Sequence, residues 1–247
     1  MPSANKKHII GNGLIAGCLK SAEFNKKTLF LASGVSNSKE VREAEFQRES
    51  ELITSSIQRY PDCHVVYFST CSLEGGGGSP YTEHKLQMES LIQNLSCNFN
   101  ILRLPQVVGL VWNSTLISFF VNSIWSASIL NVEKYATRNL LDVQDVSRIV
   151  QQLINTESGI NSVQNIASGK SVSVVDIVEK IANLLNREAK INLTPTGSHL
   201  QVSVDFLSQV LKPNDPLFAD DYWIQVLNKY IPKYIKQIES RSLQSGI

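Results

Sequence analysis

A tyrosine and a lysine four residues apart, Tyr81 and Lys85, form the pattern in this sequence that most suggests chemistry. On a helix this spacing places both side chains on one face, where an ammonium group can lower the pKa of a phenol. An apolar run ending in Ser69 and Thr70 precedes them, and a hydroxyl at a strand end can share the phenolic proton. An isolated pair of this kind is more often a surface contact, so the hypothesis depends on the rest of the chain.

A glycine-rich turn with the pattern G-x-G-x-x-A lies near the start of the chain, between an apolar run and a helical pattern. Glycine allows a tight turn and close approach of the backbone to a pyrophosphate, and the following helix start offers N–H groups and a favourable dipole. The alternative is an ordinary strand-to-helix turn. The candidate phosphate-binding residues are Gly11, Asn12, Gly13, Leu14 and Ile15.

Short apolar runs alternate with longer segments of helical apolar spacing, which predicts strands and helices in alternation. The predicted strands are His8–Ile10, Thr28–Ala32, His64–Phe68, Asn100–Leu104 and Ser162–Ile166. The predicted helices are Leu14–Ala22, Val41–Ile57, Lys85–Leu95, Val143–Leu153, Val174–Leu185 and Asp220–Ile238. This order predicts an α/β fold, a Rossmann-like doubly wound parallel sheet with ligands at the carboxyl ends of its strands.

The character of the sequence changes from about Arg187 onward, where Asn192–Ala219 contains three prolines and a glycine. Such composition indicates loops and short elements of a second, smaller lobe. We therefore predict a dinucleotide-binding core formed by residues 1–110 and 137–168. Residues 111–136 and 169–247 would form a small, mainly C-terminal substrate lobe.

Composition excludes several classes of function. The 23 basic and 22 acidic residues nearly cancel, so no nucleic acid or anionic membrane is expected as a partner. The most apolar stretch, Leu116–Leu130, is interrupted by polar residues and is too short to span a bilayer. The four cysteines lack metal-ligand spacing, so we expect no metal site, and the start of the chain lacks a secretory pattern. A cytoplasmic protein with reduced cysteines is the expectation.

Together these motifs resemble the extended short-chain dehydrogenase/reductase family, which includes nucleotide-sugar epimerases, dehydratases and ketoreductases. The resemblance covers nearly the whole chain and is carried by Ile9–Ala16, Leu31–Gly34, Tyr67–Thr70, Tyr81–Lys85, Leu102–Gly109, Arg138–Asp145 and Asn165–Val174. It implies NAD or NADP as cofactor and a nucleotide-linked sugar as substrate, as in surface-polysaccharide synthesis. It also implies a homodimer formed through a face of two helices, Val41–Ile57 and Lys85–Leu95.

The resemblance assigns roles to individual residues. Tyr81 resembles the catalytic acid/base, Lys85 its activator and ribose anchor, and Thr70 the hydroxyl partner. Gln106 and Arg138 match substrate-contacting positions, the arginine being suited to gripping a diphosphate with its paired donors. The positions that match cofactor contacts are Gly11, Asn12, Gly13, Leu14, Ile15, Ala32, Ser33, Gly34, Ser69, Tyr81, Lys85, Leu104 and Pro105.

Two departures from the family pattern are visible. Only Glu23–Lys27 separates the first helix from Thr28–Ala32, which matches the family's fourth strand, so strands two and three are missing and strand one becomes an edge or near-edge strand. The residue that distinguishes NAD from NADP then has no counterpart. The loop Leu73–Pro80 contains four consecutive glycines, which predicts a flexible linker in place of a substrate clamp.

The two residues directly after Thr70 bear on the choice of reaction. Dehydratases of this family carry an Asp-Glu pair there, whereas this chain has Cys71 and Ser72, which favours an epimerase or a ketoreductase. His84 is expected to point away from Tyr81 into solvent or to cap the helix. The alternative hypothesis is a catalytically reduced or regulatory nucleotide-binding protein of the same fold.

Overall fold

The chain divides into two compact units in the computed structural model, which describes residues 7–76, 78–110 and 115–245. Gly77 of the predicted glycine linker and residues 111–114 at the start of the predicted lobe lie outside the described residues. Unit 1 comprises Met1–Pro105, Val143–Ile166 and Ser203–Lys212, and unit 2 comprises Gln106–Asp142, Ala167–Val202 and Pro213–Ile247. These bounds differ from the predicted domains at residues 106–110, 137–142, 167–168 and 203–212.

Unit 1 is built around a sheet of five parallel strands in the order β1-β2-β3-β4-β8. The strands are β1 (Lys7–Ile10), β2 (Thr28–Leu31), β3 (His64–Thr70), β4 (Phe99–Leu104) and β8 (Ser162–Asn165). All residues of β2 and β3 are buried, as expected for central strands of a sheet covered on both faces. The predicted parallel α/β fold is confirmed, and its five strands match the predicted ones within two residues at each end.

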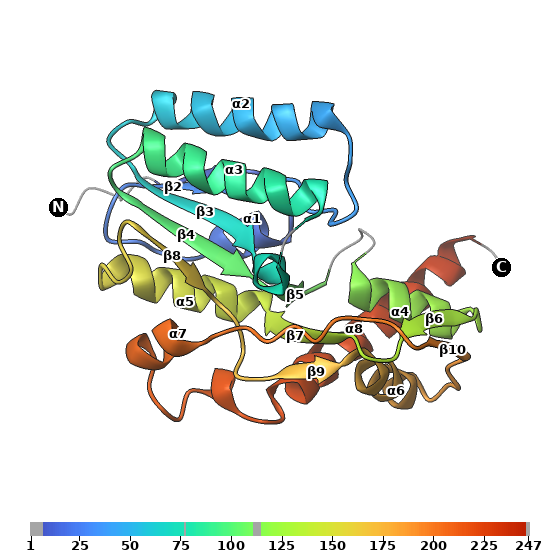
Figure 1. The fold of residues 1–247 in the computed structure, drawn as a ribbon. Helices are drawn as coiled ribbons and strands as arrows, with labels where there is room; N and C mark the ends of the chain where they lie inside the picture. Colours follow the sequence, from blue (N-terminus) through green and yellow to red (C-terminus); the bar gives the residue numbers. More distant parts are fainter. Residues whose placement is uncertain (1–6, 77, 111–114, 246–247) are drawn as a thin grey trace. The chain divides into compact units, whose positions relative to one another are not determined.

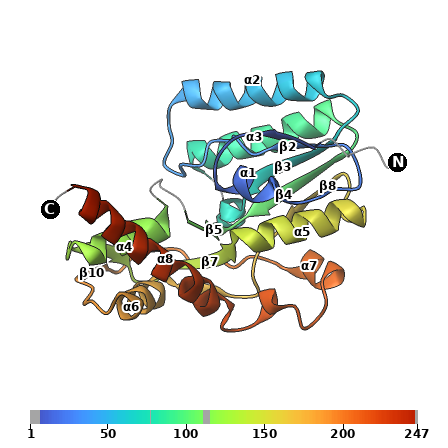
Figure 2. The ribbon, with the colours of Figure 1, turned by 180° about the vertical axis from the view of Figure 1, so that it is seen from behind.

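Helices cover both faces of this sheet (Figures 1 and 2). α2 (Glu43–Arg59) and α3 (Pro80–Leu95) lie together on one face, and α1 (Leu14–Leu19) packs with α5 (Val143–Asn155) on the other. A further short helix, α7 (Asp205–Val210), contacts β8. The core between the sheet and the α2–α3 face is formed by aliphatic and aromatic side chains of β2, β3, β4, α2 and α3.

β1 lies at one edge of the sheet and pairs in parallel with β2, from Lys7 opposite Thr28 to Ile10 opposite Leu31. Its four residues are only half-buried, unlike those of its neighbour β2. The prediction that strand one is an edge strand is therefore confirmed. The β-strand and helix that usually come after the first βα unit have no counterpart between α1 and β2.

The segment between β3 and α3 positions the tyrosine. After Thr70 the chain forms a short 3₁₀ helix, Cys71–Gly75, so regular structure covers part of the predicted flexible linker. Gly76 has φ 97°, a left-handed conformation that favours glycine. Ser79 then starts α3 with a capping box, in which its side chain accepts from the Thr82 N–H, and Pro80 takes the first helical position. Tyr81 is thereby fixed in the first turn of α3.

Unit 2 contains two small sheets and three helices of ten or more residues among the described residues. β5 (Gln106–Val108), β7 (Thr137–Asp142) and β9 (Ser171–Ser173) form one sheet, and β6 (Leu130–Glu133) pairs with β10 (Ile191–Thr194). The helices are α4 (Leu116–Trp125), α6 (Val174–Leu185) and α8 (Tyr222–Ser245), with a short 3₁₀ helix at Pro216–Phe218. In residues 7–76, 78–110 and 115–245, no helix combines the length and the apolar character that crossing a bilayer requires.

Candidate active site

Tyr81 and Thr70 meet at the carboxyl end of β3. Both residues are 7% exposed, and the Thr70 side chain acts to lower the pKa of the Tyr81 phenol. Thr70 Oγ1 also accepts from the Ser72 N–H at 3.1 Å and donates to Ser72 Oγ at 3.1 Å. The end of β3 and the start of α3 thus position a buried hydroxyl and a buried phenol.

Lys85 lies on the same side of α3 as Tyr81, with its ammonium 5.9 Å from the centre of the Tyr81 ring. The side chain is almost fully buried, at 2% exposure. Its Nζ donates to Glu49 Oε1 at 2.9 Å and to the Tyr67 hydroxyl at 3.0 Å. The sequence suggested Lys85 as a ribose anchor; Glu49 and Tyr67 accept from two of the three N–H donors of its ammonium group.

The carboxylate of Glu49, on α2, is the centre of this arrangement. Its Oε1 accepts from Lys85 and, at 2.7 Å, from the Tyr67 hydroxyl. Its Oε2 accepts from the Val35 N–H at 2.7 Å and from His84 Nε2 at 3.0 Å. These four donors match the acceptor capacity of a carboxylate. We call Glu49, Tyr67, His84 and Lys85 the Glu49 cluster.

His84 corrects one expectation. The sequence suggested a solvated or capping histidine, but the side chain is 3% exposed and stacks on Phe46, with ring centres 4.5 Å apart. A carboxylate only accepts hydrogen bonds, so the His84 nitrogen that faces Glu49, Nε2, must carry the proton. Helical spacing does place His84 away from Tyr81, but α2 covers that side and excludes solvent.

Burial and charge set the protonation of these groups. Burial by itself raises the pKa of Glu49, but hydrogen bonds from His84, Lys85 and the Val35 N–H, with the Lys85 charge, outweigh it and lower that pKa to about 2. Burial lowers the pKa of Lys85, and the Glu49 carboxylate opposes this. Burial raises the pKa of Tyr81; the Thr70 hydrogen bond counteracts the rise and the Glu49 charge adds to it. Tyr81 is therefore a phenol at neutral pH.

The loop after β2 lies against the Glu49 cluster. A Cβ atom added at Gly34 would come within 2.5 Å of Glu49 Oε1 and 2.8 Å of Lys85 Nζ, so only glycine fits there without moving the ion pair. Ala32 and Ser33, the other loop residues suggested for cofactor contact, are half-buried. Arg48 of α2 also donates to the Ser33 carbonyl, at 3.5 Å.

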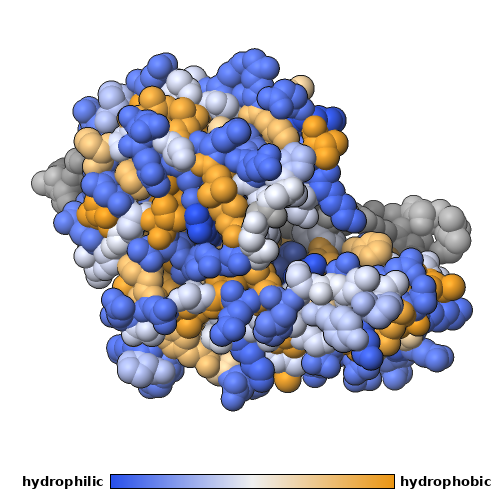
Figure 3. Space-filling model, in the orientation of Figure 1, coloured by the Kyte–Doolittle hydropathy of each residue, from blue (hydrophilic) through white to orange (hydrophobic). Residues whose placement is uncertain are grey.

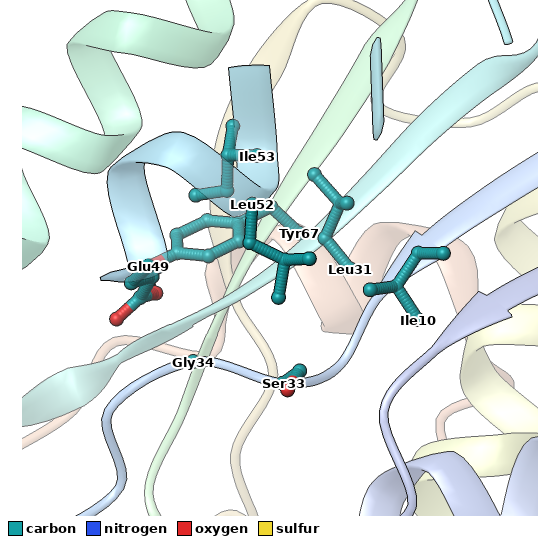
Figure 4. Close-up of a pocket in the computed structure, with 8 residues that line it drawn as sticks. All are labelled: Ile10, Leu31, Ser33, Gly34, Glu49, Leu52, Ile53 and Tyr67. Carbon is teal, nitrogen blue, oxygen red and sulfur yellow. The ribbon is translucent and has the colours of Figure 1, made fainter. Parts of the chain in front are cut away.

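A small hollow with a volume of about 10 Å³, partly open to solvent, lies beside this loop (Figure 4). Its apolar wall is formed by side chains of β1, β2 and α2, and Glu49 and Tyr67 point toward each other at one side of it (Figure 4). Ligand pockets usually enclose roughly 300–1,000 Å³. The hollow is therefore too small to be a dinucleotide pocket by itself.

The glycine turn, Gly11–Ile15, fits a diphosphate in part. Gly11 has φ 131°, and a Cβ atom there would lie 2.3 Å from the Ala32 carbonyl oxygen. The packing of the chain against the residue after β2 thus requires glycine at this position. A Cβ atom at Gly13 would meet nothing within 4 Å, and both Asn12 and Gly13 are exposed. Open space at a helix start without a side-chain cap is compatible with a phosphate group. Beyond β1, on the adenosine side, no further strand pairs with this sheet among the described residues.

The remaining suggested cofactor contacts in unit 1 lie at the ends of β3 and β4. Leu104 pairs in register with Thr70, and Pro105 comes directly after it. Ser69 is buried and donates to Glu89 Oε1 at 2.6 Å. Cys71, the residue after Thr70, donates its thiol to the Arg103 carbonyl at 3.1 Å, and burial raises its pKa. Cys71 is thus a packed thiol and not a ready acid/base.

The two suggested substrate contacts belong to unit 2. Gln106 is on β5 and Arg138 on β7, two residues from Leu140, the partner of Gln106 in register. Arg138 is half-buried and donates to the Thr137 carbonyl at 2.7 Å. The structure brings Thr70, Tyr81 and Lys85 together within unit 1, and Gln106 and Arg138 together within unit 2. In the described part of the chain, no group of histidines, cysteines and carboxylates could hold a metal ion.

Glu49 and Tyr67 are the site residues that sequence reasoning missed. A signal existed for Glu49: Phe46, Glu49, Ile53 and Ile57 have helical spacing and are all buried, which places a carboxylate within the apolar stripe of α2. A charged residue at such a position is rarely buried unless it is paired. The sequence does not indicate which lysine pairs with it.

The sequence matches no protein-family model and no curated protein. The fold does match solved structures. dTDP-glucose 4,6-dehydratase from Bacillus anthracis, in complex with NAD, is 16% identical over 87% of this chain and 74% of its own, with a TM-score of 0.69. MoeE5 in complex with UDP-glucuronic acid and NAD is 20% identical over 81% of this chain and 76% of its own, with a TM-score of 0.63.

UDP-glucose 4-epimerase from Thermotoga maritima, with UDP-glucose, is 16% identical over 72% of this chain and 69% of its own, with a TM-score of 0.57. At these identities the likeness concerns the fold. It agrees with the parallel five-stranded sheet of unit 1. The chain therefore has the fold of the NAD-dependent nucleotide-sugar epimerases and dehydratases of the extended short-chain dehydrogenase/reductase type.

Proposed function

We propose that this chain is an NAD(P)-dependent oxidoreductase or epimerase acting on a nucleotide-linked sugar, with Tyr81 as its acid/base. The observation that carries the proposal is that buried Tyr81, in the first turn of α3, and buried Thr70, at the end of β3, accompany the Lys85 ammonium, which is 5.9 Å from the centre of the tyrosine ring. Similar folds bound to NAD and to UDP-sugars support the substrate class. A bound nicotinamide would accept or supply the hydride.

The protein's own groups would bind the dinucleotide and the substrate and would transfer the proton. The exposed amides of the glycine turn would hold the diphosphate, and the loop Ala32–Gly34 would lie under the dinucleotide. When a keto-sugar is reduced, Tyr81, a phenol at neutral pH, would donate its proton to the carbonyl oxygen; when a sugar hydroxyl is oxidised, the Tyr81 phenolate would accept the hydroxyl proton, with Thr70 as the hydroxyl partner in both directions. Gln106 and Arg138 would bind the sugar and its diphosphate.

Epimerisation or reduction of a keto-sugar is the reaction we favour. The positions after Thr70 hold a packed thiol and Ser72, and the nearest carboxylate along the chain, Glu74, pairs with Arg103 at 3.3 Å. An elimination needs a second group that moves a proton, and these contacts leave none at that place. A matched fold that belongs to a dehydratase does not decide the reaction, because the same fold supports several.

Substitution of the tyrosine tests the acid/base assignment. Tyr81→Phe removes the hydroxyl and keeps the ring, so turnover of a UDP- or dTDP-linked sugar is expected to fall by about 10²–10⁴-fold, with dinucleotide binding retained. Tyr135→Phe is the control, because Tyr135 belongs to unit 2 and is 55% exposed. Full activity of Tyr81→Phe would refute the mechanism.

A nucleotide-binding protein with reduced or no catalysis is the second candidate. It is favoured by β1, which is a sheet edge, and by Lys85, whose hydrogen bonds are made to Glu49 and Tyr67. Binding of NADH or NADPH without turnover of any nucleotide sugar would select this candidate over the enzyme.

A homodimer through α2 and α3 is part of the proposal. These helices lie together on one face of unit 1, where hydrophobic side chains alternate with hydrophilic ones (Figure 3). Leu86 and Leu95 of α3 are 45% and 39% exposed, and Val41 before α2 is 69% exposed. Light scattering is expected to give twice the mass of the chain, and a monomer at all concentrations would contradict it.

A further inference from the structure

The carboxylate of Glu49 connects several segments of unit 1. Its buried carboxylate joins three separate segments of unit 1: the loop at Val35, strand β3 at Tyr67, and helix α3 at His84 and Lys85. A buried ion pair contributes little net stability compared with apolar side chains of the same size. Its four satisfied contacts do, however, fix the position of the Lys85 ammonium.

That position matters for Tyr81. The Lys85 Nζ is 5.9 Å from the centre of the tyrosine ring and only 2.9 Å from Glu49 Oε1. A lysine alone would favour the phenolate, because an opposite charge within about 4–6 Å stabilises an ionised group. The paired carboxylate carries the opposite charge, and it acts to raise the pKa of the Tyr81 phenol.

Other titratable and charged groups also surround this pair. His84 and Tyr67 complete the Glu49 cluster, Thr70 acts to lower the pKa of Tyr81, and Glu89 and Arg48 act on Lys85 with opposite sign. Glu89 is itself paired with Arg103 at 2.7 Å. Glu49 is therefore the group whose charge opposes that of Lys85 at the shortest range.

We propose that Glu49 is a positioning residue that fixes Lys85 and offsets its charge, so that the site keeps Tyr81 as a phenol, the form that donates a proton. If the chain has the function proposed above, a neutral Tyr81 makes the site suited to protonating a substrate oxygen. The effect is supported by the pKa of Tyr81, which burial raises and which the Glu49 charge raises further. The inference rests on the proposed function only for this last step.

Tyrosine titration tests the proposal without any cofactor. Protein labelled with ¹³C at tyrosine Cζ would be titrated by NMR, with the Tyr81 signal assigned from Tyr81→Phe. Glu49→Gln removes a negative charge near Tyr81, so the Tyr81 midpoint should fall by about one pH unit or more. Lys85→Met removes the positive charge, so the midpoint should rise. Glu51→Gln, an exposed carboxylate on the same helix, should leave it unchanged.

The double variant Glu49→Gln/Lys85→Met keeps the test decisive if a single variant does not fold. Both charges are then absent, and the Tyr81 midpoint should lie within about half a unit of the wild-type value, since the two opposite shifts that the proposal predicts offset each other. A Glu49→Gln midpoint that is unchanged or raised, or a double-variant midpoint more than about one unit from wild type, would overturn the proposal. A purely structural role for Glu49 would lower stability in every variant without this pattern of opposite shifts.

The results that would refute the role of Glu49 differ from those that would refute the proposed function. If neither NADH nor NADPH binds but the tyrosine midpoints shift as stated, the proposed function fails and the role of Glu49 stands. If a dinucleotide binds and Tyr81→Phe is inactive but the midpoints do not shift, the function stands and Glu49 has no such role.

Discussion

Two neighbouring regions of unit 1 differ in whether their polar groups are buried and hydrogen-bonded or exposed. In the Glu49 cluster the polar side-chain atoms are buried and bonded to one another. The glycine turn, directly after the half-buried edge strand β1, exposes Asn12 and Gly13 and leaves open space at Gly13. The chain itself supplies every partner in the first region, whereas in the second a ligand could supply them. The side chains beside the proposed acid/base are thus held by one another, whereas the turn proposed to bind the ligand is left open.

Removal of a lysine from the Glu49 cluster, compared with removal of one from β1, the strand before the glycine turn, gives the largest expected contrast. Lys85→Met leaves the Glu49 charge buried without its ion partner and should lower the free energy of unfolding by about 3–5 kcal/mol. Lys7, on β1, donates to carbonyls at the end of α1, those of Leu19, Lys20 and Ala22, and is only half-buried. Lys7→Met should cost about 1 kcal/mol. Urea denaturation measures both, and equal losses would break the comparison.

Two glycines of the turn should behave differently from each other. Gly11→Ala places a Cβ atom 2.3 Å from the Ala32 carbonyl oxygen at a positive φ, so stability should fall by about 2–3 kcal/mol. Gly13→Ala meets nothing within 4 Å and should change stability by less than about 0.5 kcal/mol. Thermal unfolding followed by circular dichroism checks the pair. A large loss of stability for Gly13→Ala would show that protein atoms occupy the space beside Gly13.

Acid should weaken the Glu49 cluster selectively. The pKa of Glu49 is lowered from 4.5 to about 2 in the folded chain, so its ionisation stabilises the fold above about pH 4.5, and this contribution is lost as the pH falls toward 2. Between pH 5 and pH 3 the wild type should lose about 2 kcal/mol from this group. Urea denaturation of Glu49→Gln at the same two values should show a loss smaller by that amount. Parallel pH dependence of the two proteins would contradict the assignment.

The sequence predicted the sheet more completely than the site. Strands such as β2 and β3 are uninterrupted apolar runs, so their identity is local information, and the short link Glu23–Lys27 was enough to predict that β1 is an edge. Which side chains meet across α2, α3 and β3 depends on the packing of segments that are 18 to 36 residues apart. Lys85 was thus recognised as important without its partner Glu49, and His84 was expected in solvent although α2 covers it.

The central claim is that a chain with an edge strand at β1 still binds a nicotinamide dinucleotide at the glycine turn beside a phenolic Tyr81. Calorimetric titration with NADH and NADPH measures this most directly, with Gly13→Val as the comparison, because a valine would fill the space that Gly13 leaves open. We expect at least one dinucleotide to bind the wild type with a dissociation constant below millimolar, and Gly13→Val to bind at least about tenfold more weakly. No heat with either dinucleotide at millimolar concentration would contradict the account.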